Sequence, residues 1–181
     1  GTLPVPGKET VKYGGNTSCV TLEFPKGNFF IFDAGTGIKA LSDHFMAQKQ
    51  SKIEAEIFIS HPHWDHINAL PFFAPLYVKG NYFVIHGPSH CDTNMRELIS
   101  AQMDGVYFPI NINEFAANIN FRDLKEETFY IDGIKIKTLL LNHPGQCLGY
   151  RVEYNTRSVC YVTDNEIYPK ASQFYNDEYV N

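Results

Sequence analysis

Apolar residues along the chain recur with two spacings, one typical of strands and one typical of helices. Apolar runs predict strands at residues 17–24, 29–32, 54–60, 82–85, 120–122, 128–131, 134–141, 146–154 and 158–163. Apolar positions three or four apart predict helices at residues 38–49, 67–78 and 92–103. Pro71 and Pro75 must kink or interrupt the second helix, and Asp92 or Thr93 is the candidate N-cap of the third. The spacing alone therefore predicts a mixed α and β chain.

The densest group of metal-ligating side chains follows the predicted strand 54–60, in the sequence HPHWDH. Residues two apart in an extended segment point the same way, so His61 and His63 can face one metal ion. The chain then turns, and Asp65 and His66 can face a second position close by. Imidazole nitrogen and carboxylate oxygen suit zinc, and also manganese or iron. The alternative, a set of surface histidines, does not explain four ligand-type side chains together at a strand end.

The sequence HPHWDH resembles the HxHxDH motif of the metallo-β-lactamase fold hydrolases. Other segments are similar to the branch that contains ribonuclease Z and the cyclic-phosphate phosphodiesterases: YGGNTSCV, IFDAGTGI, LPFFAPLY, LNHPGQCLGY and YVTDNE. The resemblance covers residues 1 to about 166. It implies an α+β fold, the αββα sandwich, in which two packed mixed β-sheets carry helices on their outer faces. We expect a single hydrolase domain over residues 1–181.

The resemblance implies two divalent metal ions, with zinc as the default and manganese or iron as alternatives. His143, before a Pro-Gly pair at a strand end, would join the first two histidines of the motif at metal 1. Asp164 matches the family's bridging carboxylate; the alternative is a simple turn aspartate. Metal 2 would then hold Asp65, His66 and the shared Asp164.

Two aspartates receive further roles from the resemblance. Asp65 is the expected catalytic residue, which ligates metal 2 and orients the nucleophile. Asp33, at a strand end before Ala34 and Gly35, would hydrogen-bond to a metal-ligating histidine without binding metal itself. The alternative for Asp33 is a carboxylate at the N-terminus of the following helix.

The sequence also departs from the family. The family's site normally ends with one more histidine on a later strand, whereas no histidine follows His143 here. The short strand that normally precedes the stretch similar to residues 1–7 is also absent. We therefore expect a version of the fold truncated at both ends, with metal 2 bound more weakly than metal 1.

The remaining histidines and an aromatic segment receive weaker assignments. His44 is expected on the surface of a helix. His86 and His90 fall in a predicted loop where the family places no metal ligand, so contact with substrate is left open for them. The aromatic residues Tyr107, Phe108 and Phe115 in the irregular segment 104–118 are expected to pack in the core or in a lid, with a platform for substrate as the less favoured alternative.

The net charge and the cysteines indicate which binding partners and which cellular compartment to expect. The net charge of −5 and the absence of a basic run argue against broad nucleic-acid binding. No apolar run is long enough to span a membrane. Cys19, Cys147 and Cys160 lie in apolar strand-like runs and are expected to be reduced core residues, which favours a cytoplasmic protein. A homodimer is left open.

The sequence therefore predicts a metal-dependent hydrolase, with a phosphodiesterase acting on a small or cyclic phosphodiester as the leading function. A hydroxide generated at a two-metal site would attack phosphorus in line with the leaving group. One alternative is hydrolysis of a thioester, lactone or lactam on the same site, because metal ligands do not encode the substrate. Another is a domain that binds or senses metal without catalysis. A ribonuclease Z role is disfavoured, because no basic insertion that would hold tRNA is found.

Overall fold

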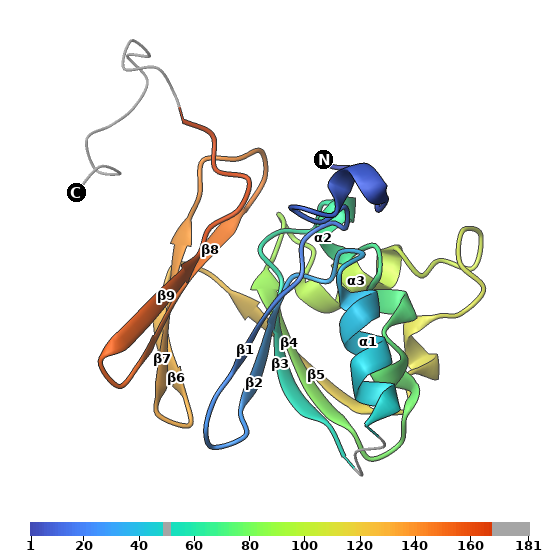
Figure 1. Cartoon of the computed structure of the whole chain (residues 1–181), viewed down its shortest axis with the longest axis horizontal. Coiled ribbons are helices and arrows are strands. Elements are labelled where there is room, and N and C mark those ends of the chain that lie inside the picture. The colour runs from blue at the N-terminus through green and yellow to red at the C-terminus, as the bar shows by residue number, and fades with distance from the viewer. Residues whose placement is uncertain (49–51, 168–181) are drawn as a thin grey trace.

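The computed structural model describes residues 1–48 and 52–167, which form two β-sheets packed face to face with helices on one side (Figure 1). The first sheet has the order β1-β2-β3-β4-β5. Its strands are β1 (Val20–Glu23), β2 (Phe29–Phe32), β3 (Glu54–Phe58), β4 (Tyr82–Pro88) and β5 (Asn118–Leu124). The first two strands form an antiparallel hairpin, and β2 to β5 run parallel. The predicted two-sheet α+β architecture is thus confirmed.

The second sheet is antiparallel throughout, with the order β6-β7-β8-β9. Its strands are β6 (Thr128–Ile131), β7 (Ile134–Leu140), β8 (Leu148–Tyr154) and β9 (Arg157–Tyr161). Asp132 and Gly133 join β6 to β7 with backbone φ angles of 48° and 83°. Positive φ at both central residues suits a tight hairpin, as the Asp-Gly pair predicts.

Helices cover the outer face of the first sheet, away from β6 to β9 (Figure 1). The longer ones are α1 (Ile38–Ala47) and α3 (Met95–Ala101), and short 3₁₀ turns are η1 (Lys8–Thr10), η2 (Leu70–Phe72), η3 (Ala74–Tyr77) and η4 (Ile112–Glu114). In the described part of the chain no helix covers the outer face of the second sheet, where Tyr130 and Leu139 are exposed. The expected helices on both outer faces are therefore present on one.

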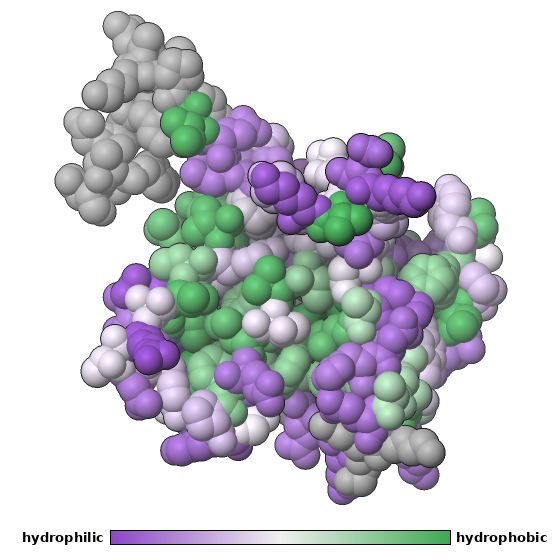
Figure 2. Space-filling view, in the orientation of Figure 1, coloured by the Kyte–Doolittle hydropathy of each residue, from purple (hydrophilic) through white to green (hydrophobic). Residues whose placement is uncertain are grey.

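Side chains at alternating positions of the central strands pack into two separate hydrophobic cores. Ile31 and Ile57 face the helices, whereas Phe32 and Phe58 face the second sheet, and all four are buried. A parallel strand covered on both faces needs apolar residues at consecutive positions, which explains the continuous apolar runs of β2 and β3. Figure 2 shows apolar side chains gathered on the face where the core between the sheets opens to solvent.

The segment after β3 differs from the prediction in its helix boundaries. A helix was expected from residue 67, but the short helix α2 (Trp64–Ile67) begins three residues earlier. Asp65 and His66 therefore lie in a helical turn. The proline-interrupted helix expected over 67–78 is replaced after α2 by η2 and η3, with prolines in their first positions. Pro fits there because the first helical N–H groups have no partner within the helix.

Three further predictions are corrected. The third helix is capped by Asn94, whose side chain accepts a hydrogen bond from the Glu97 N–H, and not by Asp92 or Thr93. His86 lies inside β4, not in a loop. Cys160 is exposed on the edge strand β9 and Cys19 is only half-buried, whereas Cys147 is buried as expected.

Within residues 1–48 and 52–167, no helix combines the length and the apolar content that crossing a membrane requires.

Candidate metal centre

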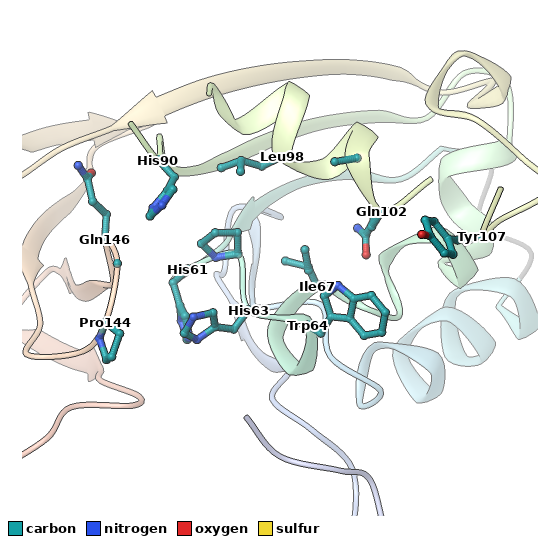
Figure 3. A pocket seen from close by; sticks show the side chains of 13 residues that line it. His61, His63, Trp64, Ile67, His90, Leu98, Gln102, Tyr107, Pro144 and Gln146 are labelled. Atoms are coloured by element: carbon teal, nitrogen blue, oxygen red, sulfur yellow. The ribbon is translucent and has the colours of Figure 1, made fainter. Parts of the chain in front are cut away.

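The predicted ligands meet at one end of the sandwich, where three connections of the two sheets come together. β3 leads into Ser60 and the motif, β7 leads into the loop that carries His143, and β9 leads into Asp164. Figure 3 shows His61 and His63 beside the 144–146 loop, with a cavity extending toward α3. The site is thus assembled from both sheets.

One ligand group contains His61, His63, His143 and Asp164. His143 Nε2 lies 3.1 Å from His63 Nδ1, and Asp164 Oδ2 lies 3.6 Å from the Nε2 atoms of His61 and His143. A tetrahedral zinc site with bonds of about 2.0–2.1 Å has ligand atoms about 3.3 Å apart. These separations therefore match the edges of a tetrahedral site.

The hydrogen bonds around His61 leave one nitrogen lone pair for a metal ion. The Ser60 hydroxyl donates to Asp33 Oδ2 at 2.9 Å, so its oxygen accepts from His61 Nδ1–H at 3.0 Å. His61 Nε2 then carries a lone pair, and this buried atom has no hydrogen-bond partner among the described residues. A buried acceptor without a partner is costly unless an ion or water meets it, and the donor set here suits a divalent metal.

A second ligand group contains Asp65, His66 and the same Asp164. His66 Nε2 lies 3.6 Å from Asp65 Oδ2 and 3.4 Å from Asp164 Oδ2. Because Asp164 belongs to both groups, its carboxylate would be available to an ion at either position. The structure thus brings together all six predicted ligands; their binding of metal stays a prediction.

Asp33 fixes His66 from behind, as expected for a residue that supports a ligand. Its Oδ2 accepts a hydrogen bond from His66 Nδ1–H at 2.7 Å, which leaves His66 Nε2 free to face the second group. The Ser60 N–H donates to Asp33 Oδ1, and the Tyr161 hydroxyl donates to Oδ2, each at 2.7 Å. Tyr161 on β9 therefore ties the second sheet to this network, a link that sequence analysis missed.

The backbone around Asp33 holds α2 in place. The Ala34 N–H donates to the His66 carbonyl, and the Ala69 N–H donates to the Ala34 carbonyl. A Cβ on Gly35 would clash with the Asp65 carbonyl oxygen, so only glycine fits there. Asp33 and Asp164 both adopt positive φ, a conformation that non-glycine residues keep mainly where the surrounding structure enforces it.

The electrostatic environment differs between the histidines. Burial, assisted by repulsion from His66 and His63, lowers the pKa of His61 to about 3. Burial and the neighbouring His143 also lower the pKa of His63. Burial opposes protonation of His66 too, but the hydrogen bond and charge of Asp33 prevail and raise its pKa. Without metal, burial thus favours the neutral forms of His61 and His63, while Asp33 favours the protonated form of His66.

The N-terminal residues reach the second group. The Thr2 N–H donates to Asp65 Oδ2 at 2.7 Å, and it helps to lower the pKa of Asp65 against the opposing effect of burial. Sequence analysis missed this contact, because residues 1–7 carry no ligand-type side chain that would signal it.

A cavity of about 400 Å³ adjoins the first ligand group. Its lining includes His90 and Tyr107, together with Trp64 and Gln102 (Figure 3). Tyr107 is 85 % exposed, so the expected core or lid packing is wrong for this residue. Phe108 and Phe115 do pack, against Phe72 and Tyr77.

The other two histidines lie outside the centre. His86 pairs with Glu56 and stacks on Phe58 between the sheets. His44 is exposed in α1, where it contacts Gln48. Neither lies among the residues that line the cavity.

Comparison with known proteins gives a family match over most of the chain. The family model described as "Beta-lactamase superfamily domain" matches residues 28–177. A ribonuclease Z of Prochlorococcus marinus subsp. pastoris is 31 % identical over 144 residues, which cover 76 % of this chain and 44 % of the relative. The chain thus spans less than half the length of this curated relative.

Solved structures share the fold at low sequence identity. The metallo-beta-lactamase fold protein YhfI of Bacillus subtilis has a TM-score of 0.57 at 16 % identity, covering 89 % of this chain and 59 % of YhfI. Human tRNase Z, short form, has a TM-score of 0.53 at 20 % identity, covering 81 % of this chain and 62 % of the human protein. These similarities agree with the two-sheet architecture described above.

Proposed function

We propose that this chain, which belongs to the beta-lactamase superfamily by the match over residues 28–177, hydrolyses phosphodiesters with two divalent metal ions. The observation that carries the proposal is the shared carboxylate of Asp164, within 3.6 Å of the Nε2 atoms of His61, His66 and His143. A carboxylate between two ligand groups suits a pair of ions, the arrangement common in phosphoryl-transfer enzymes. Zinc is the metal that the imidazole-rich first group favours.

The residues of the chain would divide the chemical tasks between them. Two ions held here would lower the pKa of a shared water and neutralise charge on the phosphoryl oxygens. Asp65 would orient the attacking water, since its carboxylate lies at the second group and faces the space that Asp164 borders. Asp33 would hold His66 in the tautomer that leaves Nε2 free.

Comparison of three substrates on the zinc-loaded protein tests this proposal. Bis(p-nitrophenyl) phosphate should be hydrolysed faster than nitrocefin, a lactam, or a glutathione thioester. Asp65→Asn should lower turnover by orders of magnitude while circular dichroism stays unchanged. A faster reaction with nitrocefin or the thioester would transfer the assignment to that substrate class, and a folded, metal-binding protein inactive on all three would favour a non-catalytic domain.

Cleavage of RNA is the second candidate, because the similarity to ribonuclease Z favours it. The net charge of −5 opposes it, since RNA-binding proteins neutralise phosphates with basic patches. We therefore place the small phosphodiester first. If a structured RNA is cleaved at a lower substrate concentration than bis(p-nitrophenyl) phosphate, and with a strong salt dependence, RNA becomes the first candidate substrate.

A further inference from the structure

We propose that the cavity beside the metal centre binds a planar aromatic group of the substrate between Trp64, Tyr107 and Gln102. This inference rests on the proposed function, because it assigns the neighbouring subsite to part of the same phosphodiester. It adds a specificity that the metal ligands do not encode.

Two aromatic side chains border the cavity without being buried in the protein. Trp64 is 76 % exposed and Tyr107 is 85 % exposed. Both line the same cavity, Trp64 from α2 and Tyr107 from the segment after α3, and Figure 3 shows them at one end of it. Exposed aromatic rings offer flat faces for stacking, and they lose little conformational freedom when a ligand covers them.

The position of Trp64 links this surface to the chemistry. It lies between His63 of the first ligand group and Asp65 of the second, at the first position of α2. Its neighbours point to the metal centre while its indole borders the cavity. A phosphodiester whose phosphorus lies at the metal centre would thus place one of its ester groups against the indole.

The rest of the lining suits a flat, mostly apolar group with a polar edge. Ile67, Leu98 and Ala101 supply apolar surface. Gln102 supplies an amide group at the polar edge of the lining, with its oxygen on the side of Trp64 and Tyr107 (Figure 3). A cavity of about 400 Å³ lies within the usual range of roughly 300–1,000 Å³ for small-molecule sites.

Trp64 is the only tryptophan in the sequence, so indole fluorescence reports this position alone. Three ligands would be titrated into the zinc-loaded protein. 4-Nitrobenzylphosphonate has a planar ring and a phosphonate, cyclohexylmethylphosphonate has the same anionic group on a saturated ring, and 4-nitrobenzyl alcohol has the planar ring alone. None has a phosphoester bond to be hydrolysed, so binding is measured without turnover.

We expect 4-nitrobenzylphosphonate to quench the Trp64 emission and, by calorimetry, to bind about 3–10-fold more tightly than cyclohexylmethylphosphonate. Trp64→Leu and Tyr107→Leu should each reduce this preference. Tyr107 is an exposed loop residue, so its variant keeps the test open even if Trp64→Leu fails to fold. Tyr130→Leu is the matched control, because it removes an exposed phenol from the outer face of β6 and should leave the preference unchanged.

The outcomes separate this inference from the proposed function. Equal affinity of the two phosphonates without quenching would overturn the aromatic subsite, and metal-dependent binding of both would leave the proposed function standing. A preference for the planar ring that persists when zinc is removed, with no effect of zinc on either phosphonate, would support the subsite and count against the phosphodiesterase proposal.

Discussion

The two ligand groups share Asp164 but are built in different ways. The first group collects three imidazoles and a carboxylate, which make a complete tetrahedral set for zinc. The second has one imidazole and two carboxylates, and water must complete its coordination. The first group therefore offers more ligands, and we expect it to bind metal more tightly.

The hydrogen bonds that orient the ligands are more direct in the second group than in the first. In the second group, His66 is fixed by the buried Asp33, which Ser60 and Tyr161 hold in turn. In the first group, His61 reaches Asp33 only through the Ser60 hydroxyl, and His63 and His143 contact each other through their ring nitrogens, at 3.1 Å. We therefore expect the number of ligands to determine the affinity for the first ion, and the orientation of His66 by Asp33 to determine the affinity for the second. The following experiments separate these two contributions.

The largest effect should follow from Asp164→Asn, because Asp164 belongs to both groups. The amide is a weaker ligand than the carboxylate, so both ions should bind at least about 100-fold more weakly, beyond the 10–100-fold typical of a lost supporting partner. Asparagine tolerates the positive φ of this position, so the fold should persist. Calorimetric zinc titration and turnover of bis(p-nitrophenyl) phosphate would measure the loss.

Asp132→Asn is the matched control for this variant. Asp132 also has positive φ, in the β6–β7 turn and away from the ligands, so both metal-binding steps should stay as in the unmodified chain. Selective weakening of only one step by Asp164→Asn would show that the carboxylate is not shared.

The unmodified chain should bind zinc in two separated steps, because its two groups differ in ligand number. We expect a tight first step and a second step that is at least about tenfold weaker, because the second group has fewer protein ligands than the first. Elemental analysis after mild dialysis should then give between one and two equivalents of metal. A single step with two equal sites would show that another group, such as the Thr2 backbone region beside Asp65, compensates at the second position.

The sequence predicted the ligands better than it predicted their surroundings. The HPHWDH motif pointed to His61, His63, Asp65 and His66, and the resemblance to the family added His143 and Asp164; the structure brings these six side chains together. The start of α2 was missed because HPHWDH has no conventional N-cap side chain. The sequence had no signal for the Tyr161–Asp33 contact, which joins residues 128 positions apart.

The sequence also did not predict which aromatic residues line the cavity. Tyr107 lies in an aromatic segment whose spacing suggests packing, yet it is exposed, while Phe108 beside it packs on Phe72. Which of two adjacent aromatic residues faces solvent is decided by the irregular backbone between α3 and η4. Periodicity carries no information about such a segment.

Asp33→Asn should affect the second ion more than the first, because Asp33 contacts His66 directly and reaches His61 only through the Ser60 hydroxyl. The amide loses the charge that favours His66, and the second zinc step should weaken about 10–100-fold, whereas the first should change little. Asp33 has a φ of 60°, which asparagine accepts. Glu56→Gln is the matched control, because it disturbs a histidine–carboxylate pair outside the centre, between the half-buried Glu56 and the buried His86. Equal weakening of both steps would indicate a general loss of structure.

The smallest expected effect is on the pH dependence of metal binding. It follows from the different pKa values of His61 and His66 in the metal-free protein. Asp33 raises the pKa of His66, whereas burial lowers that of His61 to about 3. A metal ion must displace a proton from His66 below its raised pKa, so the second step should weaken as pH falls through that pKa. His61 is neutral above about pH 3, so it imposes no such requirement on the first step.

Histidine ring NMR of the metal-free protein would measure this difference. The ring of His66 should titrate above the ordinary value of about 6.5, and that of His61 should show no protonation until strongly acidic pH. Asp33→Asn should lower the pKa of His66, because the hydrogen bond and charge of Asp33 are the main causes that raise it. Two rings that titrate together near the ordinary value would remove the electrostatic contrast and leave ligand number as the sole difference between the groups.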